Sequence, residues 1–425
     1  MTGNALLAAK MASAGLRQHE LAQALNDWIE TLTGRPGTLQ DRHVRNWLTG
    51  RTGWPQERQR RALEAVLGCT VQELGFVRPS RSTAPLPAPP EDPVRRRAFA
   101  GGMVGFVATA ALPPRTAAPY RRIGMSDTER LRTAFADLVA SDNATGGTPS
   151  LETRAVAFAH HAMELQAVGT ASQRVRARLY ELAAAFTGTA LWAAVDSCEP
   201  ERAQRHLERA MTLAGLSGSA EITLRLWGHA GILARQTRQF NDAVAAATAA
   251  RSSSACRKDP IFRSLAHARL AGAYAGARQG IAALRTLEHA VKAFDIADPR
   301  ADRPVWMGFY DRAELHGLSA LVHAGIGRHE EAEAHLHHTL ALLRPGFNRN
   351  RSYYRCHLAL AQLRQGEAEQ ACSTALSVLP AQPGDSLTER TTRLLTEFTT
   401  ELRSVASGAR CATEWMDQYR PRRPQ

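Results

Sequence analysis

The sequence predicts an all-α protein, with a small N-terminal helical domain and a long C-terminal array of helix pairs. Aromatic residues make up only 6% of the 425 residues, and alanine and leucine supply most of the apolar content. Both residues rank near the top of helix propensity. Apolar positions recur at helical spacing through most of the chain, and small residues return at long, regular intervals. Together these observations predict a small N-terminal helical domain followed by an α-solenoid.

Changes in composition divide the chain into four predicted segments. Residues 1–78 alternate short helical patterns with turns, and residues 79–120 form a linker rich in proline, alanine and arginine. Residues 121–406 show helical patterns almost throughout, and residues 407–425 form a basic tail. Six prolines within 79–93 exclude helix or sheet ladders there, so that stretch is expected to act as a semi-stiff spacer.

The linker contains a run, RRRAFAGGMVGFVATAAL at 95–112, that looks like a twin-arginine export signal. Such signals lie at the N-terminus, whereas this run begins almost a hundred residues into the chain. Its apolar part, as a helix, would span roughly 22 Å at 1.5 Å per residue, which is short of the roughly 30 Å hydrocarbon core of a bilayer. We therefore expect a linker in a cytoplasmic protein, with neither export nor a membrane span.

The N-terminal segment predicts five short helices in sequence. An apolar side predicts a first helix over 4–14, which Gly15 ends, and a second helix follows over 15–26. A longer connection is expected over 27–37. The remaining helices are expected from Thr38 to Gly50, within 55–68 and, as a short last helix, over 70–75.

The third of these helices has two chemically different faces. Thr38 followed three residues later by Asp41 resembles a capping box, which makes Thr38 the expected N-cap, and Gly50 takes the usual position after the end. The apolar face carries Leu39, Val44, Trp47 and Leu48, and the opposite face carries Arg42, Arg45, Asn46 and Thr49. Arginine can donate two hydrogen bonds to guanine and asparagine can pair with adenine, so this face suits the major groove of double-stranded DNA.

Residues 4–76 resemble the lambda-repressor/Xre-type helix-turn-helix domain. The residues at matching spacing are Gln18, Leu21, Ala22, Val44, Trp47, Gly50 and Pro55. Two departures are a longer turn between the second and third helices, and Leu48 where the family commonly has glutamate. The resemblance implies base and phosphate contacts at the start of the second helix and along the third. We expect DNA contacts from Gln18, Arg42, Arg45, Asn46, Thr49 and Arg51.

Five segments of the C-terminal part align in one frame. Alanine stands at 203, 243, 283, 332 and 368, at intervals of 40, 40, 49 and 36 residues. Twelve residues earlier stand the mostly small residues Leu191, Gly231, Ala271, Ala320 and Cys356. Small residues at fixed positions let the two helices of a pair approach closely, so five helix pairs are expected across 172–380. Residues 127–170 and 386–406 are expected to add further or capping helices.

This pattern resembles the tetratricopeptide repeat, most clearly at Trp227, Gly231, Ala243, Ala247 and Ala250. A helix-turn-helix followed by such an array resembles a group of actinobacterial transcriptional regulators, and also the peptide-sensing regulators of Gram-positive bacteria. The resemblance implies a sequence-specific DNA-binding transcriptional regulator whose repeat domain mediates homodimerisation or senses a peptide or protein effector. The alternative is a tetratricopeptide-type protein-interaction scaffold without specific DNA binding.

An effector groove is expected where the first helices of the pairs line the inner surface of the array. Arginines interleaved with aromatic residues would suit an acidic peptide or one that ends in a free carboxylate. The candidate groove residues are Arg225, Arg263, His267, Tyr310, Arg312 and Tyr354.

Charge and cysteine content bound the remaining function classes. The net charge of +13 favours an anionic partner such as DNA, although only three of the basic residues are lysine and a GC-rich genome also accounts for the arginine excess. The six scattered cysteines form no C-x-x-C pair, and the histidines at 329, 335 and 338 are expected on a solvated helix face instead of at a metal. Since no Ser-His-Asp order or phosphate loop occurs, we expect neither an enzyme nor a cofactor.

Overall fold

The computed structural model describes residues 3–33, 36–77, 122–380 and 387–419. Within these ranges the regular structure is nineteen α-helices and one short 3₁₀ helix, besides an isolated bridge between Arg122 and Thr170. The predicted all-α class, with a helical-repeat solenoid, is confirmed. The predicted linker 79–120 and its run 95–112 lie outside the described residues, as does the end of the predicted tail. Among the described helices, none combines the length and the hydrophobicity that a transmembrane span requires.

Four short helices form the N-terminal unit and bury a common core. They are α1 (Ala5–Ser13), α2 (Gln18–Thr33), α3 (Asp41–Leu48) and α4 (Glu57–Leu67). Asn4 caps α1 by accepting the backbone N–H of Leu7 at 3.0 Å. The core side chains that are fully buried include Leu7, Leu21, Leu25, Val44, Leu63 and Leu74. All but Leu74, which follows α4 in a turn, stand at helical spacing on the apolar faces of the helices, so the amphipathic pattern accounts for most of this core.

Three local expectations for this unit were wrong. The stretch expected as a connection is helical as far as Thr33, because Trp28 and Ile29 extend the buried face of α2. The N-cap of α3 is Gln40, whose backbone N–H donates to His43 Nδ1 at 3.0 Å, and not Thr38. The expected last helix at 70–75 is a hydrogen-bonded turn.

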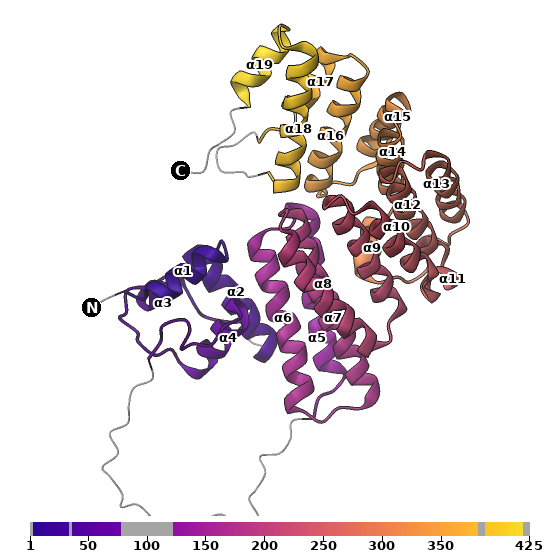
Figure 1. Cartoon of the computed structure of the whole chain (residues 1–425). Coiled ribbons are helices and arrows are strands. Elements are labelled where there is room, and N and C mark those ends of the chain that lie inside the picture. Colours follow the sequence, from indigo (N-terminus) through magenta and orange to yellow (C-terminus); the bar gives the residue numbers. More distant parts are fainter. Residues whose placement is uncertain (1–2, 34–35, 78–121, 381–386, 420–425) are drawn as a thin grey trace, which may run out of the picture.

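The five expected helix pairs are present and follow one another around an arc (Figure 1). They are α7 (Gln173–Asp196) with α8 (Pro200–Ser217), α9 (Ala220–Gln236) with α10 (Phe240–Ser252), α12 (Pro260–Gly276) with α13 (Gly280–Asp295), α14 (Arg312–Gly325) with α15 (His329–Leu342), and α16 (Asn348–Arg364) with α17 (Ala368–Leu376). Before them lie α5 (Met125–Thr145) and α6 (Pro149–Val168), and after them α18 (Glu389–Ala406) and α19 (Arg410–Gln418). The connections hold α11 (Ser254–Lys258) and the 3₁₀ helix η1 (Val305–Phe309).

Every pair turns in the same way. One residue takes a left-handed conformation, and the next N–H donates to a carbonyl five residues back, as in the Schellman motif. The first and last of these bonds run from Glu199 to Ala194 at 2.9 Å and from Glu367 to Gln362 at 3.0 Å. The left-handed residues are Cys198, Arg238, Arg278, Gly327 and Gly366.

A fully buried alanine stands five residues after each left-handed turn residue. In the first four pairs it is the predicted alanine, at 203, 243, 283 and 332. In the fifth pair it is Ala371 instead of the predicted Ala368, and its counterpart on α16 is Ala359 instead of Cys356. The predicted register of the fifth pair was therefore wrong by three residues. The sequence allowed this error because Cys372 and Ala375 fit the repeat pattern whether it starts at Ala368 or at Ala371.

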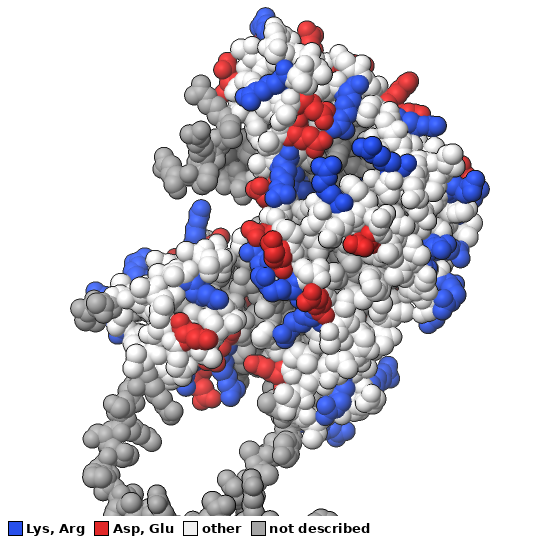
Figure 2. All heavy atoms as spheres, in the orientation of Figure 1, with Lys and Arg blue, Asp and Glu red and all other residues white. Residues whose placement is uncertain are grey.

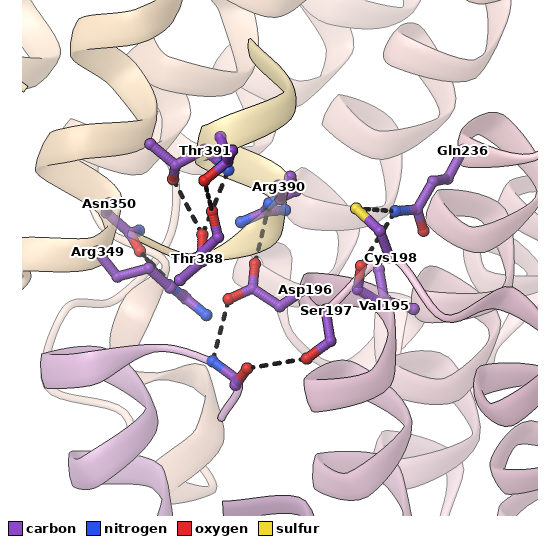
Figure 3. Close-up of polar contacts among 12 residues, drawn as sticks. Val195, Asp196, Ser197, Cys198, Gln236, Arg349, Asn350, Thr388, Arg390 and Thr391 are labelled. Atoms are coloured by element: carbon purple, nitrogen blue, oxygen red, sulfur yellow. Dashed lines mark hydrogen bonds and ion pairs between the residues drawn. The ribbon is translucent and has the colours of Figure 1, made fainter. Parts of the chain in front are cut away.

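The two ends of the array meet. Arg349 on α16 pairs with Asp142 on α5 at 3.2 Å, and Arg390 on α18 pairs with Asp196 at the end of α7 at 3.0 Å. Asp196 also accepts the backbone N–H of Gly147 at 3.0 Å (Figure 3). These contacts close the concave side of the array into a cavity.

The N-terminal unit packs on α6, with α2 and α4 beside it (Figure 1). Ala157 of α6 belongs to the N-terminal core. Asp27 pairs with Arg154 at 3.4 Å, and the rings of Trp28 and His161 meet edge to face with centroids 5.9 Å apart. The helical unit and the array therefore share one helix.

Candidate functional site

The first candidate site is the outer face of α3. Arg42 and Arg45 are exposed, while Val44 and Trp47 on the opposite face are buried in the N-terminal core. Among the described residues neither arginine has an ion-pair partner. Figure 2 shows both basic and acidic side chains over this unit on the face in view. The cationic face is therefore local to α3, where guanidinium groups can reach a polyanion without first breaking an ion pair.

The other predicted DNA-contact residues surround this face. Arg51 is exposed just beyond the end of α3, and Asn46 is half-buried. Thr49 is exposed, but its hydroxyl donates to the carbonyl of Arg45 at 2.9 Å. Gln18 is half-buried at the start of α2, the helix that packs against α3. The structure thus places all six on one small unit.

The second candidate site is the cavity inside the array, which has a volume of about 550 Å³. Its walls come from α5, α7, α9, α10, α12, α14, α16 and α18 together with η1, so the first helices of all five pairs contribute. Apolar and aromatic side chains form much of the wall, including Trp192, Trp306, Phe309 and Tyr353. Cavities of about 300–1,000 Å³ with such walls are typical of small-molecule sites.

Two of the six predicted groove residues line this cavity, Arg225 and Tyr354. Tyr310 is instead a core residue whose hydroxyl meets Ser264 Oγ at 2.8 Å, and Arg312 pairs with Asp295 outside the cavity. Arg263 and His267 lie on α12 but are not part of the wall; His267 packs on His289 of α13.

The cavity holds cationic residues that the sequence interpretation missed. They are Arg235, Arg269, Arg349, Arg390 and Arg393, with the imidazole of His357; the imidazole of His229, which the sequence placed on an inner helix, also lines the wall. On α9 the wall residues 225, 229, 232 and 236 follow helical spacing, a pattern that was visible in the sequence. The pattern does not show whether this face of α9 points into the cavity, because both faces of the first helix of a pair are partly apolar.

Burial changes the protonation behaviour of these groups. Desolvation lowers the pKa of Arg225 and of Arg269 to about 10, so both guanidiniums remain charged at neutral pH. Burial lowers the pKa of His229 well below its usual value, and the nearby charges of Arg225 and Arg269 add to this effect. Burial also lowers the pKa of His357 to about 3, helped by neighbouring arginines. The fixed positive charge in the cavity therefore comes from arginine, while its histidines are neutral.

The acidic groups of the cavity satisfy only some of these arginines. Asp142 pairs with Arg349, and Asp196 pairs with Arg390. Arg225 donates to the carbonyl of Ala185 at 3.0 Å and to Thr189 Oγ1 at 3.1 Å, which are neutral acceptors. In the part of the chain that the structure describes, no carboxylate forms an ion pair with Arg225, Arg235 or Arg269.

Two glycines let the unpaired arginines lie flat on the neighbouring helix. A Cβ added at Gly228 on α9 would overlap Nη1 of Arg269, and one at Gly272 on α12 would lie 3.0 Å from Nη1 of Arg235. The two arginines thus cross between α9 and α12 in opposite directions. Their guanidiniums are held in place by packing instead of by carboxylates.

The histidines at the fourth pair come together with two others. His335 and His338 on α15 lie beside His316 and His323 on α14, and His316 Nδ1 is 2.9 Å from His335 Nδ1. Among the described residues no group of three or more histidine, cysteine or acidic side chains is placed to hold a metal ion. The six cysteines are free thiols.

Comparison with known proteins finds no matching family model and no matching curated protein. Solved structures with loose likeness include BtubC (BKLC) from P. vanneervenii, at 12% identity and a TM-score of 0.34, over 70% of this chain and 95% of that one. Pseudomonas aeruginosa PilF matches at 10% identity and a TM-score of 0.30, over 68% and 99% of the two chains. A putative kinesin light chain of Podospora anserina with nearly identical TPR-like repeats matches at 17% identity and a TM-score of 0.29. This match covers 58% of this chain and 99% of that one. The helical-repeat architecture of this protein rests on its own helix pairs.

Proposed function

We propose that this protein is a cytoplasmic, sequence-specific DNA-binding transcriptional regulator whose helical-repeat domain responds to an effector. The observation that carries the proposal is the exposed pair Arg42 and Arg45 on α3, a helix anchored from behind by Val44 and Trp47. A rigid helix with free guanidiniums on its outer face suits direct contact with base edges in the major groove. The protein acts by binding, with no catalytic step and no cofactor.

The shared helix α6 supports coupling between the cavity and the DNA-binding unit. Its Ala157 lies in the N-terminal core, whereas its other face packs on α7, which supplies Thr189 and Trp192 to the cavity wall. A ligand that changes the position of α7 would therefore act on the DNA-binding unit through one helix. An effector, whether peptide, protein or smaller molecule, must bind the DNA-competent and incompetent forms with different affinity to have this effect.

A homodimer is part of the proposal, because one helix-turn-helix unit covers a small area and paired units read two half-sites. Sedimentation of the full chain at tens of micromolar is expected to give a dimer. A monomer under those conditions would remove the dimer from the proposal and leave the DNA contact to be judged separately.

Recovery of the genomic DNA fragments that the full chain binds tests the main proposal. The double variant Arg42→Ala/Arg45→Ala is expected to lose at least about a hundredfold in affinity for the recovered site, since each bidentate base contact contributes about 1–3 kcal/mol. The matched control is Arg251→Ala/Arg285→Ala, which removes two exposed arginines from α10 and α13. Equal affinity of both double variants would show that α3 is not the reading surface.

A second candidate function is a protein-interaction scaffold without specific DNA binding. The stacked helix pairs favour it, because such arrays offer extended surfaces for partners. In that case the recovered DNA would share no sequence, and its retention would fall steeply with salt for wild type and both double variants alike.

A further inference from the structure

The strongest feature outside the DNA-binding unit is the group of three unpaired arginines in the cavity. Arg225 is only 7% exposed, yet its hydrogen bonds go to a carbonyl and a hydroxyl. Nη1 of Arg269 is buried without a hydrogen-bond partner, and so is Nδ1 of His229 beside it. Uncompensated buried charge is costly, so an arrangement of this kind is expected where an anion completes it.

The net charge of the unpaired side chains in the cavity wall indicates the charge of the anion that would neutralise them. After the pairs Arg349–Asp142, Arg390–Asp196, Arg393–Glu389 and Arg364–Glu397 are set aside, Arg225, Arg235 and Arg269 remain as the cations of the wall, and Glu314 is the carboxylate whose charge acts on Arg269. Glu314 itself accepts a hydrogen bond from Asn350 at 3.1 Å. Three cations against one carboxylate leave two positive charges, which a ligand with two negative charges would neutralise.

We propose that the cavity binds a small organic dianion, a phosphate monoester or a dicarboxylate, through the guanidiniums of Arg225, Arg235 and Arg269. The inference rests on the effector part of the proposed function and names its chemistry. Guanidinium groups match the planar, bidentate geometry of carboxylate and phosphate oxygens. The aromatic wall accepts the uncharged part of the same molecule.

Size favours a small molecule over a long peptide. The cavity measures about 550 Å³ and is walled by helices from both ends of the array. Arg269 lies against Gly228 and Arg235 against Gly272, in the wall formed by α9 and α12. A ligand that reaches these arginines is therefore surrounded by helices on several sides, which suits a compact anion.

Calorimetric titration of the full chain with phenyl phosphate and with phthalate tests the proposal and separates the two sources of the dianion. At low salt we expect one site per chain and a Kd below about 1 mM for at least one of them. Benzamide, an uncharged analogue of similar size, should bind at least tenfold more weakly. An acidic hexapeptide serves as the comparison for a peptide effector.

Arg269→Gln and Arg235→Gln are the informative variants, and each should weaken binding of the dianion at least tenfold. Arg251→Gln, an exposed position on α10, is the matched control and should bind as wild type does. A purely structural role predicts a different result: the variants would melt at lower temperature without ligand. Under the proposal they melt no lower than wild type, and their melting temperature no longer rises when phenyl phosphate is added.

Three results would overturn the proposal: no saturable binding of either dianion, equal binding of benzamide, or unchanged binding in both variants. Tight binding of the hexapeptide alone would also overturn it, in favour of a peptide effector. None of these measurements includes DNA, so they are independent of the DNA-binding test. A negative result for DNA binding at α3 would not contradict the anion site. A negative result for dianion binding in the cavity would not contradict DNA binding by α3.

Discussion

Replacing Asp196 by alanine should open the contact that closes the array. The carboxylate is fully buried and receives two partners from distant parts of the chain: Arg390 at 3.0 Å and the backbone N–H of Gly147 at 3.0 Å (Figure 3). Ser197, the next residue, donates to the carbonyl of Gly147 at 3.2 Å and is untouched by the change. The substitution thus removes the charge and the acceptor of the Gly147 N–H but leaves the hydrogen bond from Ser197 in place.

The expected loss of stability depends on the contacts that Arg390 keeps in the variant. Removing one partner of a buried ion pair costs about 3–5 kcal/mol, and an unsatisfied backbone N–H adds about 1 kcal/mol. Two facts reduce the first figure: the Arg390 side chain is 20% exposed, and its Nε contact is poorly aligned as a hydrogen bond. In the variant the Arg390 guanidinium also keeps its cation–π contacts with the rings of Tyr353 and Trp192, whose centroids lie 4.3 and 5.1 Å from its Cζ. We therefore expect a loss of about 3 kcal/mol in the free energy of unfolding.

Urea denaturation followed by circular dichroism measures this loss. The control is Asp295→Ala, which breaks the exposed pair with Arg312 and should cost at most about 1 kcal/mol. The double variant Asp196→Ala/Arg390→Met should recover part of the loss, since it leaves no unpaired charge. A single variant that unfolds at the same urea concentration as the control would refute the reasoning.

Three further predictions concern other parts of the molecule. Gly228→Ala should displace Arg269 and weaken phenyl phosphate binding several-fold, and it should lower the free energy of unfolding by about 1–3 kcal/mol. A titration that gives wild-type affinity would contradict the packing argument. The pKa of His357 is about 3 in the folded state and 6.5 is its ordinary value, so its contribution to stability is complete above pH 6.5 and lost as the pH falls toward 3. By pH 5 this amounts to about 2 kcal/mol, and His357→Gln should flatten the measured pH profile; an unchanged slope would show that the imidazole is not shielded. Ala157→Glu should place a charge in the joint core and undock the N-terminal unit, which limited proteolysis detects as faster cleavage between the unit and α5, whereas cleavage at the wild-type rate would argue against the docking.

Residue spacing along the chain predicted the helical class, the pairing of helices and most of the core of the N-terminal unit. These depend on local spacing: an alanine such as Ala243 repeats at a fixed distance from its partner, and Val44 and Trp47 share one helical face whatever surrounds them. Helix boundaries were less well determined. The stretch after residue 26 was expected to be a connection, but Trp28 is held in α2 by contact with His161 of α6, a residue far along the chain.

Which cationic residues face the cavity depends on how the helix pairs pack in three dimensions. Arg225 and Tyr354 were expected there, but Arg235 and Arg269 were not, because a sequence pattern gives the faces of a helix and not the direction in which a curved array turns them. That direction depends on the closure of the array, where Arg349 meets Asp142 across 207 residues of sequence. Contacts of such separation form through the summed packing of every intervening pair, and no local rule of spacing contains them.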